Sequence, residues 1–187
     1  MRTSWVWRPH PNPPRAPPAR SRRGRIAPGE PCSGAGSQSG TGGGRAAVTT
    51  GVGSTEMAAG MATGQLLMRV PETILVRCTG KLPPGVGAKD LALAIAGRIG
   101  ADGANYAAIE FAGPTIAAMS MDGRFTLTNL AIEMGAKAGL IGTEAVTEAW
   151  LDGRLTRTWS DPAARPARVH PPCLDSPRPR PNPPTPP

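Results

Sequence analysis

An amide and a carboxylate lie four residues apart in the stretch TNLAIEMGAK, at Asn129 and Glu133. If this stretch is helical, the two side chains project from one face, because residues four apart are neighbours on a helix surface. Together they can hydrogen-bond a bound ligand and handle a proton. The same spacing also fits a solvated polar helix face. Asn129 and Glu133 are the candidate catalytic residues, and the spacing alone leaves both interpretations open.

Two other polar patterns predict structure rather than chemistry. GVGST (51–55) resembles a phosphate-binding turn. It is not GxGxxG, because position 56 is glutamate, and it lacks GK[ST], so we expect tight packing or close approach to a neighbouring loop instead. Asp122 and Arg124 flank Gly123, which predicts a turn with a local ion pair.

The three cysteines, Cys32, Cys78 and Cys173, lie far apart in the chain. They form no CxxC pair and no Cys/His ligand spacing, so the residues predict neither a disulfide framework nor a zinc site. No cofactor-binding or metal-binding residue is assigned. Cys78 falls in an expected strand, where a free cysteine usually behaves as a small core hydrophobe.

Short strands and helices alternate along the middle of the chain. Residues 73–80 (TILVRCTG), 105–113 and 138–142 have the β-branched and apolar character of strands. Between the first two, residues 88–100 carry Leu91, Ile95 and Ile99 at helical spacing.

Further helical spacing runs over 115–137, with a break expected at Asp122–Gly123. Thr143 is expected to cap a helix through Trp150, and residues 50–72 predict a glycine turn followed by a small-residue helix. Alternation of this kind predicts an α/β fold with a mostly parallel sheet, arranged as a three-layer α/β/α domain.

The net charge of +8 is unevenly distributed along the 187 residues. Lys and Arg number 8 against 1 Asp and Glu over 1–49, 7 against 9 over 50–150, and 6 against 3 over 151–187. The middle is therefore mildly acidic, which argues against a dedicated nucleic-acid-binding face. No run approaches the roughly 20 apolar residues that cross a bilayer, and the N-terminus lacks the apolar region of a secretory signal. We expect a cytoplasmic protein without nucleic-acid or membrane partners.

Residues 1–47 and 152–187 are predicted to be disordered, and residues 48–151 to fold. The two ends are rich in Pro and Arg or in Gly and Ser, with too few apolar residues to offset the entropy of ordering. Arg, Pro, Gly, Ala and Ser without Lys are typical of GC-rich DNA read in an unselected frame, so we interpret both ends as non-native sequence. The alternative is a proline-rich ligand or a basic patch that binds a partner.

Three blocks carry a family resemblance: TTGVGSTEMAAGMATGQ, TGKLPPGVGAKDLALAIAGRIGADGANYAAIEFAG and MSMDGRFTLTNLAIEMGAKAGLI. In this order they resemble the aconitase family, most closely the 3-isopropylmalate dehydratase large subunit and its homoaconitase relatives. The resemblance covers about residues 48–151. It implies a hydro-lyase that isomerises a hydroxy-acid by dehydration and rehydration, in leucine biosynthesis for the dehydratase. It also implies a [4Fe–4S] cluster held by three cysteines and a small partner subunit that completes the substrate site.

The resemblance assigns the NxxxE motif of the family to Asn129 and Glu133. The carboxylate would act on the departing water or orient a catalytic histidine, and the amide would hydrogen-bond near the cluster. Both implied roles favour the catalytic interpretation over the solvated face.

The sequence departs from the family in two places. The family carries Asp-Ser-His-Thr shortly before the GVGST block, where this chain has GSQSGTGGGRAAV, and the match is expected to begin abruptly at Val48–Thr49. The family's cluster cysteines lie downstream of GAKAGLI, and Cys32, Cys78 and Cys173 do not match their positions. We therefore expect a hydro-lyase fragment that lacks the cluster ligands and is inactive alone. The alternatives are a homoaconitase-like or aconitase-like fragment, or a non-enzymatic α/β domain with basic, proline-rich interaction arms.

Overall fold

The computed structural model describes residues 4–7, 26–155 and 170–175. Residues 1–3, 8–25, 156–169 and 176–187 lie outside the described residues, and they include much of the two segments predicted to be non-native, 1–47 and 152–187. In chain order the elements are β1 (Ser4–Trp7), β2 (Pro31–Ala35), η1 (Ser37–Arg45), β3 (Val48–Val52), α2 (Ser54–Thr63), β4 (Leu66–Arg69), β5 (Thr73–Arg77), α3 (Ala88–Ile99), β6 (Ala108–Ala112), α4 (Pro114–Ala117), α5 (Met121–Asn129), η2 (Leu130–Met134), β7 (Ala138–Ile141), α6 (Ala145–Leu151) and β8 (His170–Asp175), where η marks a 3₁₀ helix.

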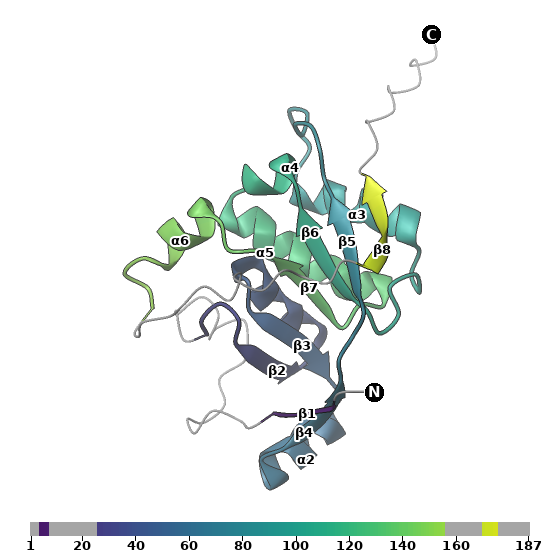
Figure 1. The fold of residues 1–187 in the computed structure, drawn as a ribbon, viewed down its shortest axis with the longest axis vertical. Coiled ribbons are helices and arrows are strands. Elements are labelled where there is room, and N and C mark those ends of the chain that lie inside the picture. The colour runs from purple at the N-terminus through teal and green to yellow at the C-terminus, as the bar shows by residue number, and fades with distance from the viewer. Residues whose placement is uncertain (1–3, 8–25, 156–169, 176–187) are drawn as a thin grey trace.

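The largest sheet has the strand order β7-β6-β5-β8, and its neighbouring strands are all parallel (Figure 1). Parallel neighbours need a crossover connection, which α3 provides between β5 and β6, and α4, α5 and η2 provide between β6 and β7. The predicted α/β class with a parallel sheet is confirmed.

Local sequence explains why α3 begins and ends where it does. The Asp90 carboxylate accepts a hydrogen bond from the Gly87 N–H at 2.8 Å, which satisfies a free donor before the first turn. Leu91 and Ile95, one turn apart, are buried on the inner face of the helix. The helix ends at Gly100, whose φ of +82° favours glycine over other residues.

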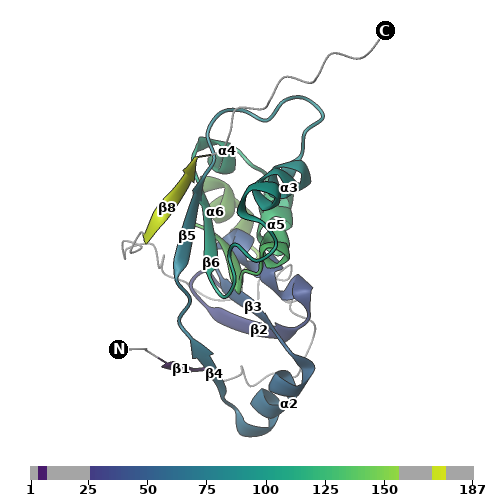
Figure 2. The ribbon, with the colours of Figure 1, turned by 90° about the vertical axis from the view of Figure 1, so that its right-hand side faces the viewer.

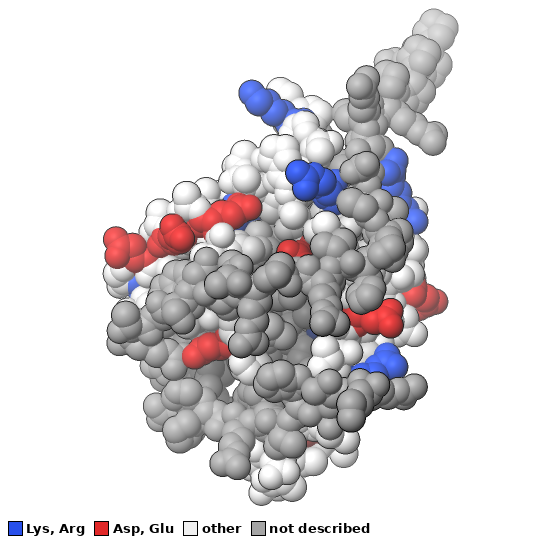
Figure 3. Space-filling model, in the orientation of Figure 1, with Lys and Arg blue, Asp and Glu red and all other residues white. Residues whose placement is uncertain are grey.

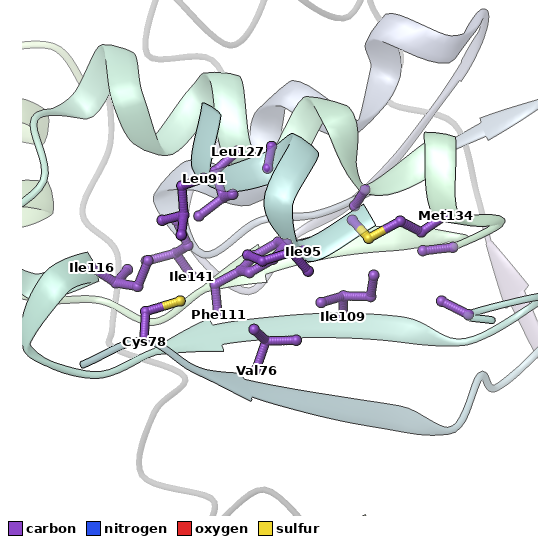
Figure 4. Close-up of a cluster of buried hydrophobic side chains, with 14 of the residues drawn as sticks. Val76, Cys78, Leu91, Ile95, Ile109, Phe111, Ile116, Leu127, Met134 and Ile141 are labelled. Atoms are coloured by element: carbon purple, nitrogen blue, oxygen red, sulfur yellow. The ribbon is translucent and has the colours of Figure 1, made fainter. Parts of the chain in front are cut away.

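The hydrophobic core lies between the sheet and the helices α3 and α5. Its ten labelled members in Figure 4 come from both layers: Val76, Cys78, Leu91, Ile95, Ile109, Phe111, Ile116, Leu127, Met134 and Ile141. Figure 2 shows α3 and α5 together on one side of β5 and β6. The opposite face of the sheet carries half-buried side chains such as Leu75 and Leu140. Within the described ranges, no second helical layer like that of a three-layer domain covers this opposite face.

A second unit, β2-η1-β3, precedes the main sheet. β2 and β3 pair in parallel, and η1 crosses between them and packs against α5, β7 and β3. The prediction of disorder over 1–47 is therefore wrong for residues 26–47. Ser39 and Arg45 are buried in η1, and burial lowers the pKa of Arg45 to about 10.

Glycines make this packing possible, because they let backbones approach directly. A Cβ on Gly43 would lie 1.7 Å from the Gly139 carbonyl oxygen in β7. A Cβ on Gly44 would lie 2.9 Å from the carbonyl carbon of Arg124 in α5. The glycine run that resembles a linker in the sequence is thus a packing surface, and the close contacts offset the entropy of ordering it.

Two further boundaries differ from the sequence predictions. The helix break falls at Ala118–Ser120 rather than at Asp122–Gly123, because the Ser120 side chain caps α5 by accepting from the Gly123 N–H at 3.3 Å. Glu144 rather than Thr143 occupies the N-cap position of α6, and it caps without a side-chain hydrogen bond.

The ends of the chain also contribute strands. β8 pairs with β5 at the edge of the main sheet, so the prediction of disorder over 152–187 is wrong for residues 170–175. Pro171 and Pro172 fall between the pairs His170–Ile74 and Leu174–Val76, where the register shifts, and prolines are tolerated at such irregularities of an edge strand. β1 pairs antiparallel with β4, which contradicts the predicted disorder at residues 4–7.

The charge of residues 26–155 matches the mild acidity predicted for the middle of the chain. This range holds nine Lys and Arg and eleven Asp and Glu. Figure 3 shows acidic side chains in a run over α6. Across the described ranges, no helix is both long enough and apolar enough to cross a membrane.

Candidate active site

Asn129 is the last residue of α5, at the point where the α-helix tightens into η2. Its side chain is half-buried, and its Nδ2 donates a hydrogen bond to the Thr41 Oγ1 of η1 at 2.9 Å. The adjacent Thr128 Oγ1 lies 3.0 Å from the Arg124 carbonyl oxygen within α5, and 3.4 Å from the Thr41 carbonyl oxygen. Two segments 88 residues apart in the sequence are therefore joined at Asn129.

Glu133 lies in η2 and is exposed. A 3₁₀ helix has three residues per turn, so residues four apart point about 120° away from each other instead of sharing a face. Residues 129–133 therefore do not form the α-helical turn on which the prediction of a shared face for Asn129 and Glu133 is based. The structure brings Asn129 to Thr41 and leaves Glu133 at the surface.

The η1 segment is the part of this site that the residue patterns alone do not reveal. Thr41 belongs to the stretch GSQSGTGGGRAAV, which stands where the resembling family has Asp-Ser-His-Thr. Ser37 and Gln38 at the start of η1 are exposed, whereas Ser39 is buried. The useful signal was the position of this stretch relative to the GVGST block, because its own composition resembles a linker.

Arg124 is fully buried next to this region and organises the loops at the carboxyl ends of β6 and β7. Its guanidinium donates to the carbonyl oxygens of Ile116, Ala117 and Met119 at 3.0–3.1 Å. It also donates to Thr147 Oγ1 at 3.1 Å and pairs with the Glu144 carboxylate. The prediction of a local Asp122–Arg124 ion pair is wrong, because the guanidinium turns inward to Glu144.

The described cysteines do not fit an iron–sulfur cluster. Cys78 is fully buried in the apolar core, and Cys32 lies half-buried in the separate β2–β3 unit. Residues 26–155 contain no group of three His, Cys, Asp or Glu side chains that could hold a metal ion. A four-iron cluster needs three or four thiolate ligands together, so no catalytic step through a cluster follows from these residues.

Burial raises the pKa of the Cys78 thiol, because the apolar core disfavours the thiolate. The folded state holds this proton more tightly than the unfolded state. The resulting stabilisation is present below the ordinary thiol pKa of 9.0 and is lost as the pH rises above it.

We expect Cys78 to react with a thiol-specific disulfide reagent at least tenfold more slowly in the folded protein than in urea, because the thiolate is the reactive form. A variant with Cys32→Ser and Cys173→Ser leaves Cys78 as the single thiol for this measurement. Equal labelling rates with and without urea would contradict the buried position.

The chain belongs to the aconitase family: the family model described as aconitase family (aconitate hydratase) matches residues 18–168. The match begins well before Val48, which contradicts the expectation that family sequence enters abruptly at Val48–Thr49. It agrees with the ordered β2-η1-β3 unit.

Three relatives have about half of their aligned residues identical to those of this chain. The 3-isopropylmalate dehydratase large subunit of Moorella thermoacetica is 51% identical over 146 residues, which cover 76% of this chain and 35% of the relative. That of Methanoregula boonei is 51% identical over 132 residues, covering 71% and 32%. The large subunit 1 of Methanopyrus kandleri is 50% identical over 125 residues, covering 67% and 30%. This chain spans about a third of the length of these relatives.

Proposed function

We propose that this chain forms the α/β portion of a hydro-lyase large subunit of the 3-isopropylmalate dehydratase kind. Such an enzyme isomerises a small hydroxy-acid by dehydration and rehydration, in leucine biosynthesis. The observation that supports this proposal is the hydrogen bond from Asn129 to Thr41. It joins the NxxxE block to η1, the segment that stands where the family has Asp-Ser-His-Thr. Two sequence blocks that lie 88 residues apart are therefore in contact beside the candidate catalytic residue Asn129.

Each side chain of the proposed site has a distinct task. The Asn129 amide is held by Thr41, which leaves its Oδ1 atom to accept a hydrogen bond from a substrate hydroxyl or a bound water. The Glu133 carboxylate is exposed and can take up or release a proton at the departing water. Asn129 thus positions the substrate, and Glu133 handles the proton.

The remaining parts of such a site would come from outside the described residues. We propose that a [4Fe–4S] cluster supplies the Lewis acid when bound, on ligands located elsewhere in a complete large subunit. A small partner subunit would complete the substrate pocket. Since residues 26–155 hold no ligand set, we propose that this chain has no turnover by itself.

The test uses the full-length Moorella thermoacetica large subunit with its small subunit. Replacing the residue aligned with Glu133 by glutamine keeps the side-chain shape and removes the charge. Turnover is expected to fall by about 10²–10⁴, the usual cost of losing a proton-transfer group. Cluster absorbance and the melting temperature should stay unchanged, because the position is exposed.

A second variant separates the two roles. Asn129→Ala at the aligned position removes neutral hydrogen bonds, worth about 0.5–1.5 kcal/mol each, so the loss of turnover should be smaller than for the glutamate. If the glutamine variant retained full turnover, Glu133 would be a solvated surface residue and the assignment would fail.

A further inference from the structure

The helix α2 is apolar around most of its circumference, yet it lies at the surface. After Glu56 it continues Met57-Ala-Ala-Gly-Met-Ala62, a pattern typical of a helix covered on several sides. Of its ten residues only Gly60 is buried, where the backbone sits against the Leu66 side chain. Met61 is 61% exposed.

The following strand extends the apolar area. Leu67 in β4 is 80% exposed, and Val70 just after it is 50% exposed. Figures 1 and 2 both place α2 and β4 together at the end of the molecule far from α4. We name this area the α2–β4 surface, with these exposed members: Ala58, Ala59, Met61, Ala62, Leu67 and Val70.

The α2–β4 surface is uncharged over a long stretch. Residues 58–68 contain no Asp, Glu, Lys or Arg, and the stretch is bounded by Glu56 and Arg69. Soluble proteins keep contiguous exposed apolar patches small, and larger ones mark surfaces that another polypeptide covers. The composition therefore indicates an apolar polypeptide surface as the occupant, not a charged ligand.

The length of the relatives indicates which polypeptide this is. The aligned stretch makes up 35% of the Moorella thermoacetica large subunit, and the family match over 18–168 includes α2 and β4. About two thirds of such a relative thus lies outside the aligned stretch and is available to cover the helix. A second copy of this chain fits less well. Successive helical residues are 100° apart, so the apolar residues from Met57 to Ala62 span more than half the circumference, beyond what one flat symmetric contact covers.

We propose that the α2–β4 surface is the docking surface for the remaining part of a large-subunit polypeptide. The inference rests on the proposal that this chain is a portion of such a subunit, and it does not depend on the roles of Asn129 and Glu133. Its test reads binding and thermal stability, whereas the test of those roles reads turnover, so the two can fail separately.

The first experiment co-expresses the tagged 187-residue chain with the Moorella thermoacetica large subunit from which the aligned stretch is deleted. Size-exclusion chromatography with light scattering measures the recovery of a 1:1 complex. We expect a complex with the unaltered chain and at least tenfold lower recovery with Met61→Glu plus Leu67→Glu. Leu93→Glu is the matched control, because Leu93 is 55% exposed on α3, outside the α2–β4 surface. Equal recovery with all three chains would overturn the proposal.

A second experiment does not depend on a truncated relative that folds. Glutamates at the positions aligned with Met61 and Leu67 are placed in the full-length Moorella thermoacetica large subunit. If these positions are internal there, the melting temperature falls by about 10 °C or more, whereas glutamate at the position aligned with Leu93 changes it little. An unchanged melting temperature would show that the surface is open in the complete subunit and would refute the docking. A homodimer of this chain that Met61→Glu plus Leu67→Glu dissociates would identify a second copy as the occupant and would equally refute it.

Discussion

Replacing Gly43 by alanine is expected to detach the β2-η1-β3 unit from β7 and to unfold it. The new Cβ would lie 1.7 Å from the Gly139 carbonyl oxygen, far closer than two atoms can approach. The backbone fixes the position of the Cβ, and the carbonyl oxygen belongs to the backbone, so no side-chain rotation relieves the clash. We expect a loss of more than the 1–3 kcal/mol typical of overpacking, measured as the free energy of unfolding in urea.

Gly97→Ala is the matched control for this prediction. Gly97 lies within α3, and a Cβ there meets nothing within 4 Å. Alanine has a higher helix propensity than glycine, so the free energy of unfolding of this variant should rise by about 0.5–1 kcal/mol. If Gly43→Ala and Gly97→Ala had similar stabilities, η1 would not pack directly on β7.

Arg124→Met is expected to cost about 3 kcal/mol or more of the free energy of unfolding. Methionine has a similar length but leaves three carbonyl oxygens and the Thr147 hydroxyl without their buried donor. Breaking a buried charged network by removing one member costs about 3–5 kcal/mol. The ion pair itself contributes a smaller part, because the Glu144 side chain is 34% exposed and water screens it. Urea unfolding gives the value.

Two further variants locate this effect. Arg154→Met removes an exposed arginine that stacks on Trp150, and we expect it to cost about 1 kcal/mol or less. Arg124→Lys keeps the charge but cannot reproduce the planar set of donors, so it should remain strongly destabilising. Full stability of Arg124→Lys would mean that charge alone matters at this position and that the carbonyl contacts do not.

The central elements could be predicted from the sequence because their patterns are local. The apolar run over 73–80 and the helical spacing of Leu91 and Ile95 appear as β5 and α3, with small differences at their ends. The misplaced helix break shows where local reasoning is weak. Asp-Gly favours a turn in isolation, and the sequence therefore predicts a break at Asp122–Gly123. In the structure the Ser120 cap starts α5 at Met121. Asp122 then lies in the first turn of the helix, where a negative charge is favourable.

The β2-η1-β3 unit could not be predicted in this way. Its order depends on contacts of Gly43 with β7 and of Gly44 with α5. These partners lie about 100 residues and about 80 residues further along the chain. The composition shows only that glycine is abundant in this segment. Flexible linkers are also rich in glycine, so composition does not distinguish the two.

In the candidate site too, local sequence patterns predict one part, and contacts between distant segments determine the other. The Asn129 position is given by a motif within one segment, whereas its hydrogen-bond partner Thr41 is given only by the tertiary fold. The expected shared face with Glu133 assumed an uninterrupted α-helix. The tightening into η2 changes the direction of the carboxylate, and no residue between 129 and 133 signals it.

The contact between Gly43 and Gly139 also constrains how the protein folds during synthesis. The ribosome adds roughly 5–20 residues per second, so the η1 backbone emerges about 5–20 s before the β7 strand that it packs against exists. The N-terminal unit therefore cannot nucleate folding as it leaves the exit tunnel. The β5-α3-β6-α5-β7 portion must assemble first, and η1 then closes onto it as a late step in the order of events.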